Sequence, residues 1–279
     1  MIKPFNFAER SLDLASTQIM GVLNVTPDSF SDGGQFTSVS AALRQAEDMF
    51  HQGASIVDIG GESTRPGASK VSVQEELDRV CPVVEQVARN LAVVVSVDTS
   101  TPEVMAESIK LGAGLINDVR AFSRPGALDV VMGSSVALCI MHMQGNPITM
   151  QKQPAYNSVL DEVLAYLSAR AADMVGQGVR QDRLIIDPGF GFGKTLEHNM
   201  QLLNGIRAFC KLGYPVLVGL SRKSMFAELL NKPVNERLYG SLSAASIAAY
   251  QGAGIIRVHD VQETKDAVLV VDAIRQFSE

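Results

Sequence analysis

The sequence lacks tryptophan, contains only three cysteines, and has no apolar run long enough to cross a bilayer. An uninterrupted apolar run such as 91–95 falls far short of the roughly 18 residues that a membrane span requires. The cysteines, Cys81, Cys139 and Cys210, are odd in number and show no CxxC spacing. This pattern argues against a disulfide framework or a zinc site, so we expect all three in the core.

The chain also lacks an excess of basic residues. It carries 24 Lys+Arg against 30 Asp+Glu, a net charge of −6, and no stretch gathers Lys and Arg into a basic face. We therefore expect no nucleic-acid partner. The first seven residues lack the apolar core of a secretory signal, which predicts a cytoplasmic protein that makes no membrane contact.

No low-complexity stretch or Pro/Ser-rich linker divides the chain. Hydrophobic residues make up 46% of the sequence, which is enough for one large core. Single α/β barrels commonly run to about 250 residues. We therefore predict one domain over residues 1–279.

A short apolar run, a polar stretch with glycine and a longer helical segment recur along the chain. Most of the apolar runs do not alternate with polar residues, which is typical of parallel strands covered on both faces. The predicted strands are 18–23, 56–59, 93–97, 115–117, 137–141, 184–186, 216–220 and 255–258. The predicted helical segments are 38–52, 73–90, 102–111, 127–132, 159–177, 196–211, a split region over 223–251, and 262–277.

Turn and cap residues agree with these elements. Thr101 and Pro102 have the pattern of an N-cap followed by proline in the first turn of a helix. Four glycines follow helical segments where a left-handed cap is expected: Gly53, Gly112, Gly178 and Gly252. Open doubly wound sheets usually carry about five to six strands. Eight βα units therefore favour a closed (β/α)₈ TIM barrel, whose active site lies at the C-terminal ends of the strands.

Polar residues stand at or just after every predicted strand end. They are Asn24; Asp58, Glu62, Thr64 and Arg65; Asp98; Asn117 and Asp118; His142; Asp187; Ser221, Arg222 and Lys223; and Arg257 and His259. Asp and Asn also start turns and cap helices, so each alone has a structural explanation. Capping does not explain Lys223, Arg257 and His259, which indicate an anion site of the kind that binds phosphate in this fold. Asp98 and Asp187 could bind a metal, accept from ligand N–H groups or act as a base.

Two glycine-rich stretches and one lysine leave alternatives open. The stretch 187–195 resembles a P-loop, but Pro188 stands where the motif requires glycine, which favours a shaped loop that presents Phe190 and Phe192 to a flat ligand. The polar stretch 60–67 has the character of a mobile active-site loop. Lys223 could form a Schiff base, as in an aldolase, or donate a hydrogen bond to a ligand. His142 could ligate a metal, although a packed core histidine is the better interpretation.

Eight segments in order resemble the dihydropteroate synthase family over the whole chain. They are GVLNVTPDSFSDGG (21–34), DIGGESTRPG (58–67), SVDT (96–99), INDV (116–119), MHMQG (141–145), DPGFGFGK (187–194), GLSRKS (219–224) and RVHDV (257–261). The resemblance implies a folate-pathway transferase that joins 6-hydroxymethyl-7,8-dihydropterin diphosphate to 4-aminobenzoate. It releases diphosphate in the presence of Mg²⁺, through an SN1-like displacement with a pterin-stabilised carbocation.

The resemblance also assigns the substrate contacts. Asp187, Asp98 and Asn117 would bind the pterin, with Lys223 as a donor to its ring. Arg257 and His259 would bind the diphosphate, and Asn24 would be the side-chain ligand to Mg²⁺. Asp98, Asp187, Lys223 and Arg257 are thus the expected catalytic residues. The 4-aminobenzoate pocket, which sulfonamides would also occupy, would use Thr64, Arg65, Pro66, Phe192 and Ser224 beside Lys223.

Further expectations concern the loops, the assembly and a rival function. The loops 25–35, with Phe30, and 60–71 would cover the site, and later helices would form a homodimer. A non-catalytic pterin-binding paralogue is an alternative, but the expected metal and diphosphate ligands argue against it. Asp58, Glu62, Asp118 and His142 have no assigned role.

Overall fold

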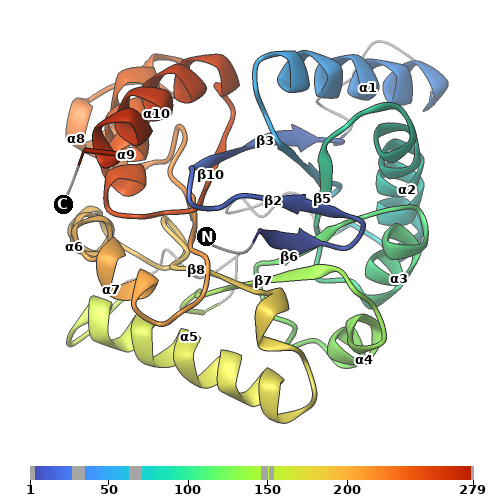
Figure 1. Cartoon of the computed structure of the whole chain (residues 1–279), viewed down its shortest axis with the longest axis horizontal. Coiled ribbons are helices and arrows are strands. Elements are labelled where there is room, and N and C mark those ends of the chain that lie inside the picture. Colours follow the sequence, from blue (N-terminus) through green and yellow to red (C-terminus); the bar gives the residue numbers. More distant parts are fainter. Residues whose placement is uncertain (1–3, 27–34, 63–70, 146–149, 151–153, 278–279) are drawn as a thin grey trace.

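A ring of helices surrounds an eight-stranded parallel sheet that curls into a barrel (Figure 1). The computed structural model describes residues 4–26, 35–62, 71–145, 150 and 154–277. The barrel strands are β3 (Gln18–Asn24), β4 (Ile56–Gly60), β5 (Val94–Asp98), β6 (Leu115–Asp118), β7 (Ala137–Met141), β8 (Leu184–Asp187), β9 (Leu217–Gly219) and β10 (Ile255–Val258). Their hydrogen-bonded order is β8-β7-β6-β5-β4-β3-β10-β9, and a parallel bridge between Ile186 and Val216 links the two ends. The predicted (β/α)₈ barrel is confirmed.

The helices follow the predicted segments closely. They are α1 (Gln35–His51), α2 (Val73–Asn90), α3 (Pro102–Lys110), α4 (Ala127–Met132), α5 (Val159–Gly176), α6 (Leu196–Asn204), α7 (Ile206–Cys210), α8 (Met225–Leu230), α9 (Leu238–Tyr250) and α10 (Val261–Arg275). The segment predicted as one helix over 196–211 breaks at Gly205, which both ends α6 and begins α7. A Cβ atom at this position would lie 2.5 Å from Leu160 Cδ1, so close packing against α5 accounts for the glycine.

Side-chain hydrogen bonds cap the starts of three helices, but not at Thr101, where the sequence predicts a cap. Ser72, Ser158 and Thr195 each accept a hydrogen bond from a backbone N–H in the first turn of their helix. Thr101 does not, because its hydroxyl accepts from Arg124 Nη1 over 3.0 Å and donates to Glu76 Oε2 over 2.7 Å, which ties α3 to α2. The four predicted left-handed glycines are confirmed, with φ of 101°, 105°, 107° and 109° at Gly53, Gly112, Gly178 and Gly252.

A hairpin absent from the predicted elements covers the N-terminal ends of the barrel strands. Strands β1 (Phe5–Phe7) and β2 (Arg10–Leu12) pair antiparallel and cross the centre of the view in Figure 1. Phe7 is buried against an apolar layer inside the barrel that includes Met20, Ile56, Val94 and Leu115. This plug closes one end of the barrel and leaves the C-terminal end for chemistry.

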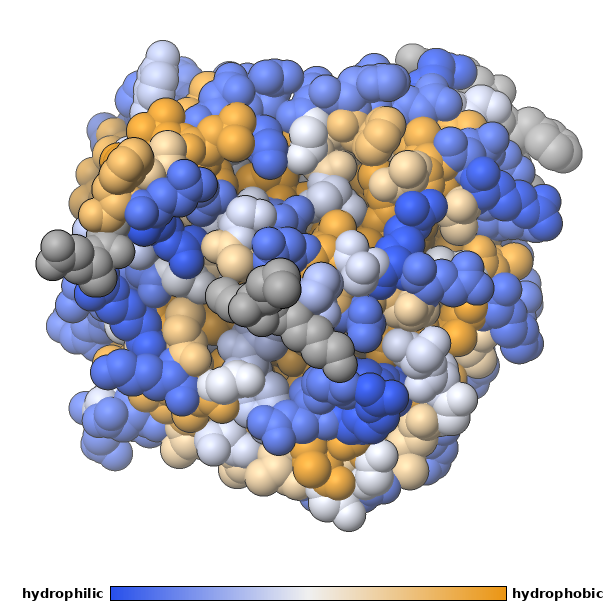
Figure 2. Space-filling view, viewed as in Figure 1, coloured by the Kyte–Doolittle hydropathy of each residue, from blue (hydrophilic) through white to orange (hydrophobic). Residues whose placement is uncertain are grey.

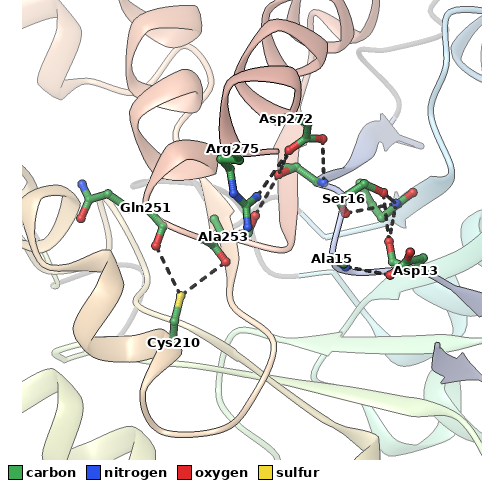
Figure 3. A network of polar contacts seen from close by, with 11 residues as sticks. Asp13, Ala15, Ser16, Cys210, Gln251, Ala253, Asp272 and Arg275 are labelled. Carbon is green, nitrogen blue, oxygen red and sulfur yellow. Dashed lines mark hydrogen bonds and ion pairs between the residues drawn. The ribbon is translucent and has the colours of Figure 1, made fainter. Parts of the chain in front are cut away.

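Hydrogen bonds fasten the segment after this hairpin to the last helix (Figure 3). Asp272 of α10 accepts from the backbone N–H of Thr17 over 3.0 Å, and the Thr17 hydroxyl donates to Ala253 O over 3.2 Å. Asp13 accepts from Ala15 N over 2.9 Å, which shapes the turn before β3. Residues near the two ends of the chain are thereby joined in one network.

All three cysteines are expected in the core, but only Cys139 is fully buried there, while Cys210 packs against the edge of the core. Cys139 is buried inside the barrel, but Cys81 and Cys210 are only half-buried. The Cys210 thiol lies 3.4 Å from Gly252 O at the turn between α9 and β10, beside the Gln251 contact drawn in Figure 3. Within the described ranges, no helix is long and apolar enough to span a membrane.

Candidate functional site

The pleat of the strands creates a polar layer inside the barrel, above the apolar one. Side chains two positions apart on a strand share a face. Ile56, Val94, Leu115, Ile185 and Ile255 form part of the lower apolar layer, and the residues two further along each strand are polar. These residues are Asp58, Ser96, Asn117, Asp187 and Arg257. Three expected site residues, Asn117, Asp187 and Arg257, therefore share this face because of strand geometry alone.

Asp58 is fully buried in the middle of this layer. Its Oδ1 accepts from Ser96 Oγ over 2.5 Å, and its Oδ2 accepts from Asn117 Nδ2 over 3.3 Å. The same Oδ2 accepts from Arg257 Nε over 2.6 Å. One carboxylate therefore connects four strands, β4, β5, β6 and β10.

Arg257 is held between two carboxylates. Besides its bond to Asp58, its Nη2 donates to Asp98 Oδ2 over 2.9 Å. Burial raises the pKa of Asp98 to about 7; the Arg257 charge opposes this rise, whereas Asp58 and Asp118 add to it. Asp98 therefore changes charge close to neutral pH.

Asp187 ends β8 and begins the tight turn that follows. Its Oδ1 accepts from the backbone N–H of Gly189 over 2.7 Å. Burial raises the pKa of Asp187, while the Gly189 bond and the Lys223 charge oppose the rise. Gly189 has a φ of 71°, and a Cβ atom there would lie 1.9 Å from His142 O. Only glycine allows the turn to pack this closely against the residue after β7.

Lys223 faces this turn from the loop after β9. Its ammonium group donates to the carbonyl of Phe190 and lies 4.7 Å from the centre of the Phe192 ring. Burial lowers the pKa of Lys223; Asp187 opposes the change and the Arg257 charge adds to it, so that the pKa lies at about 8. The prediction that both phenylalanine rings face a ligand is wrong for Phe190, whose ring is fully buried in the core and which contributes its carbonyl instead.

Lys194 fastens the turn to the neighbouring strand rather than binding a phosphate. It is buried, and its Nζ lies 2.9 Å from Gly189 O, 3.0 Å from Phe192 O and 3.0 Å from His142 Nδ1. Burial lowers the pKa of Lys194 to about 7 and that of His142 to about 3. These contacts support the interpretation of His142 as a packed histidine and explain why the stretch differs from a P-loop.

His259 follows β10 and is positioned by the loop after β9. Ser221 Oγ lies 3.2 Å from the His259 backbone N and 3.1 Å from His259 Nδ1. Arg222 does not join Arg257, because it pairs with Asp260 and its backbone has a φ of 56°. Ser224 is exposed at the start of α8, next to Lys223.

Asn24 is exposed at the end of β3. Its Oδ1 and Asp98 Oδ2 both lie 4.0 Å from the point where a Cβ atom on Gly60 would stand. A hard oxygen donor on an open edge suits Mg²⁺, which commonly takes one or two protein ligands and completes its shell with phosphate and water. In the part of the chain that the structure describes, no cluster of three His, Cys, Asp or Glu could hold a metal by itself.

Comparisons with known proteins agree with this arrangement. The family model for pterin binding enzymes matches residues 20–259. The dihydropteroate synthase of Escherichia coli (strain K12) is 54% identical over 263 residues, 94% of this chain and 93% of that protein. The chain belongs to the dihydropteroate synthase family. It is an enzyme, a transferase of folate synthesis.

Solved structures of this family share the fold. The Yersinia pestis dihydropteroate synthase, crystallised with a sulfonamide drug, matches with a TM-score of 0.91 and 50% identity over 96% of this chain and 97% of its own. The Xanthomonas albilineans dihydropteroate synthase, crystallised with 4-aminobenzoic acid, matches with a TM-score of 0.92 and 45% identity over 99% of both chains.

The structure brings most of the residues expected of this family to one end of the barrel, while three lie outside the described residues: Thr64, Arg65 and Pro66. The expected lid residue Phe30 lies outside them as well. At the base of the stretch after β4, Glu62 lies 3.8 Å from Arg120. Asp118 accepts from the backbone N–H groups of Arg120 and Phe122, so it shapes the turn after β6.

The structure also reveals supporting residues that the motifs did not single out. Asp260 pairs with Arg222, and Ser241 Oγ accepts from Arg222 N over 2.9 Å. Arg237 donates to the carbonyl of Arg222 over 3.0 Å. These residues fix the loop that carries Lys223. The RVHDV motif contains Asp260, but nothing in the sequence indicates which cation it pairs with.

Proposed function

We propose that this chain joins 6-hydroxymethyl-7,8-dihydropterin diphosphate to 4-aminobenzoate, giving 7,8-dihydropteroate and diphosphate. One observation carries the proposal: the carboxylate of Asp187 and the cations of Lys223 and Arg257 meet at the same open end of the barrel, close enough to influence one another's pKa. A ring with an N–H edge and a charged leaving group needs both kinds of partner. We further infer that the whole chain acts as one barrel domain.

The pterin would be recognised by its polar edge. Its 2-amino and N3–H groups form two donors, and the Asp187 carboxylate can accept from both. Asp98 and Asn117 would accept or donate at other ring atoms, and Lys223 would donate to the ring. Leaving such buried groups unpaired costs about 1–3 kcal/mol each, so the pocket selects a ring that satisfies them.

The diphosphate would lie against Arg257 and His259, at the last strand of the barrel. A guanidinium forms charge-assisted hydrogen bonds with phosphoryl oxygens. Asn24 would hold Mg²⁺, which when bound neutralises charge on the leaving diphosphate oxygens. These residues would stabilise the charge that grows as the C–O bond breaks, which favours an SN1-like displacement with a pterin carbocation.

The second substrate would enter beside Lys223. Phe192 and Ser224 would line its pocket together with Thr64, Arg65 and Pro66. The aromatic amine of 4-aminobenzoate is uncharged at neutral pH and needs no general base. The relatives crystallised with 4-aminobenzoic acid and with a sulfonamide drug support a pocket for both molecules.

A Schiff-base aldolase that uses Lys223 is the rival from another class of enzyme, because the lowered pKa of about 8 gives Lys223 a larger fraction of neutral amine at neutral pH than an ordinary lysine has. Borohydride reduction in the presence of carbonyl substrates distinguishes the two functions. A covalent adduct at Lys223 would support the aldolase, whereas the proposed transferase forms none. A non-catalytic pterin-binding paralogue would bind the ring and release no product.

A homodimer is proposed from the face of α9 and α10. Leu269, Val270 and Ile274 of α10 are 51%, 62% and 52% exposed, and Ile247 and Tyr250 of α9 are also exposed. Figure 2 shows hydrophobic residues gathered over the region that these helices occupy in Figure 1. Exposed apolar patches of this kind mark association surfaces. The three free thiols favour the reducing cytoplasm as the place of action.

The test of the function is product formation. Purified protein is incubated with both substrates and Mg²⁺, and 7,8-dihydropteroate is identified by chromatography and mass spectrometry. The proposal predicts product that requires both substrates. Its absence under these conditions, with the pterin still bound, would instead support the paralogue. Sedimentation velocity measures the dimer in the same preparation.

A further inference from the structure

Asp58 is a carboxylate buried inside the barrel, and none of the expected substrate contacts accounts for it. It is fully buried, and its three partners, Ser96, Asn117 and Arg257, come from three other strands. A buried carboxylate is tolerated only when it is paired and hydrogen-bonded. Its Oδ2 accepts from both Asn117 and Arg257, so this single oxygen fixes where these two side chains lie relative to each other.

The contacts also fix which atoms the two side chains present above Asp58. The Asn117 amide donates its Nδ2 to Asp58, so its oxygen is the atom directed elsewhere, as an acceptor. Arg257 uses Nε for Asp58 and Nη2 for Asp98, so the guanidinium plane is set by two bonds. A guanidinium meets phosphate well only in a defined plane.

We propose that Asp58 is a positioning residue that orients Asn117 for the pterin and Arg257 for the diphosphate. The inference rests on the proposed function of those two residues. Asp58 itself touches neither substrate and acts through the atoms that it holds. Ser96 in turn holds the other oxygen of Asp58.

Two substitutions distinguish the positioning role of Asp58 from the effect of its negative charge. Asp58→Ala removes every acceptor, whereas Asp58→Asn removes the charge but keeps one oxygen that accepts from Asn117 and Arg257. The amide of the asparagine variant can donate to Ser96. We expect Asp58→Ala to raise the KM for the pterin diphosphate at least tenfold and to leave the KM for 4-aminobenzoate within twofold. Asp58→Asn should recover most of this loss.

Binding of inorganic diphosphate with Mg²⁺, measured by calorimetry, gives an independent readout that needs no turnover. Removing a negative charge near an anion site tightens anion binding when charge alone matters. Loss of Arg257 orientation weakens it. We expect Asp58→Ala to weaken diphosphate binding at least fivefold. Tighter binding, or equal effects of the alanine and asparagine variants, would overturn the proposal.

Two further variants keep the proposal testable if Asp58→Ala does not fold. Ser96→Ala removes one bond to Asp58 without changing its charge, and we expect a two- to threefold rise in the KM for the pterin diphosphate alone. Asp272→Asn removes a carboxylate that holds the opposite end of the barrel, and it should lower thermal stability with both KM values unchanged. If Ser96→Ala behaves like Asp272→Asn, Asp58 is merely structural. If the wild type forms no product, the proposed function fails, while calorimetry still tests the role of Asp58.

Discussion

Arg257 Nη2 lies 2.9 Å from Asp98 Oδ2, so the residue expected to bind the diphosphate and a residue expected to bind the pterin are paired with each other. Asp98 nevertheless has a pKa of about 7, because burial and the charges of Asp58 and Asp118 outweigh the guanidinium. Lys223, across the site, has a pKa of about 8. The charge state of the site therefore changes within a narrow range around neutral pH.

Pterin affinity should be greatest between about pH 7 and about pH 8. Below this window Asp98 takes up a proton and loses its charge as an acceptor, and above it Lys223 loses the proton that it donates. Pterin fluorescence titrations across acidic and alkaline pH measure this directly, since the chain has no tryptophan to add background. A flat profile would contradict the assignment of both groups.

Arg257→Ala should weaken binding of the pterin diphosphate by about 1.5–3 kcal/mol, the contribution of a charged hydrogen bond. Calorimetry with the diphosphate substrate and Mg²⁺ provides the measurement. Arg89→Ala is the matched control, because Arg89 is exposed at the end of α2, where it pairs with Glu85, and should leave this affinity unchanged. Wild-type affinity in the Arg257 variant would remove this residue from the diphosphate site.

Asp187→Asn should abolish pterin binding and leave the fold intact. The amide has nearly the same shape as the carboxylate, but it presents a donor to the two N–H groups of the ring edge. Circular dichroism checks the fold and fluorescence titration checks the binding. Asp173→Asn, on the exposed side of α5, serves as a control for the loss of one charge. Retained pterin affinity would mean that another carboxylate binds this edge.

Lys194→Met should lower the free energy of unfolding by about 2 kcal/mol near neutral pH, because buried acceptors cost about 1–3 kcal/mol when they lose their donor. The relief of a buried charge offsets part of this loss. The folded pKa of Lys194, about 7, lies below its ordinary value of 10.5, so the unfolded chain binds more protons between these values. The lysine therefore adds stability as pH rises from about 7 to about 10.

Urea unfolding at neutral and alkaline pH measures both effects. The stability gap between the wild type and Lys194→Met should widen as pH rises through this range. Lys110→Met, at an exposed position, should show neither effect. An equal gap at both pH values would show that Lys194 is charged in the folded protein to the same extent as in the unfolded chain.

Much of the barrel could be predicted because its strands are continuous apolar runs. The strands 137–141 and 255–258 and the helix 73–90 end where the sequence predicts. The β1–β2 hairpin could not be predicted in this way. Its strands have three residues each and are stabilised by contacts with the barrel interior, where Phe7 packs, rather than by any local pattern.

The site could be predicted to the level of residue type and strand end, but not to the level of the atoms used. Phe190 illustrates the limit: it stands between Gly189 and Gly191, both at positive φ, and this backbone turns its ring into the core and its carbonyl towards Lys223. For Asp58, in contrast, the sequence does contain a signal that predicts a place inside the barrel. Asp58 lies two residues after Ile56 on the inward face of a strand, a position that the apolar pattern reserves for the barrel interior.

The most direct test of this account is diphosphate release from purified protein given the pterin diphosphate and Mg²⁺, with and without 4-aminobenzoate. Diphosphate is quantified by a coupled assay, and pterin fluorescence is followed alongside. The account predicts release that depends on 4-aminobenzoate and matches the amount of 7,8-dihydropteroate formed. Pterin binding with no release of diphosphate would contradict it and identify the chain as a non-catalytic pterin binder.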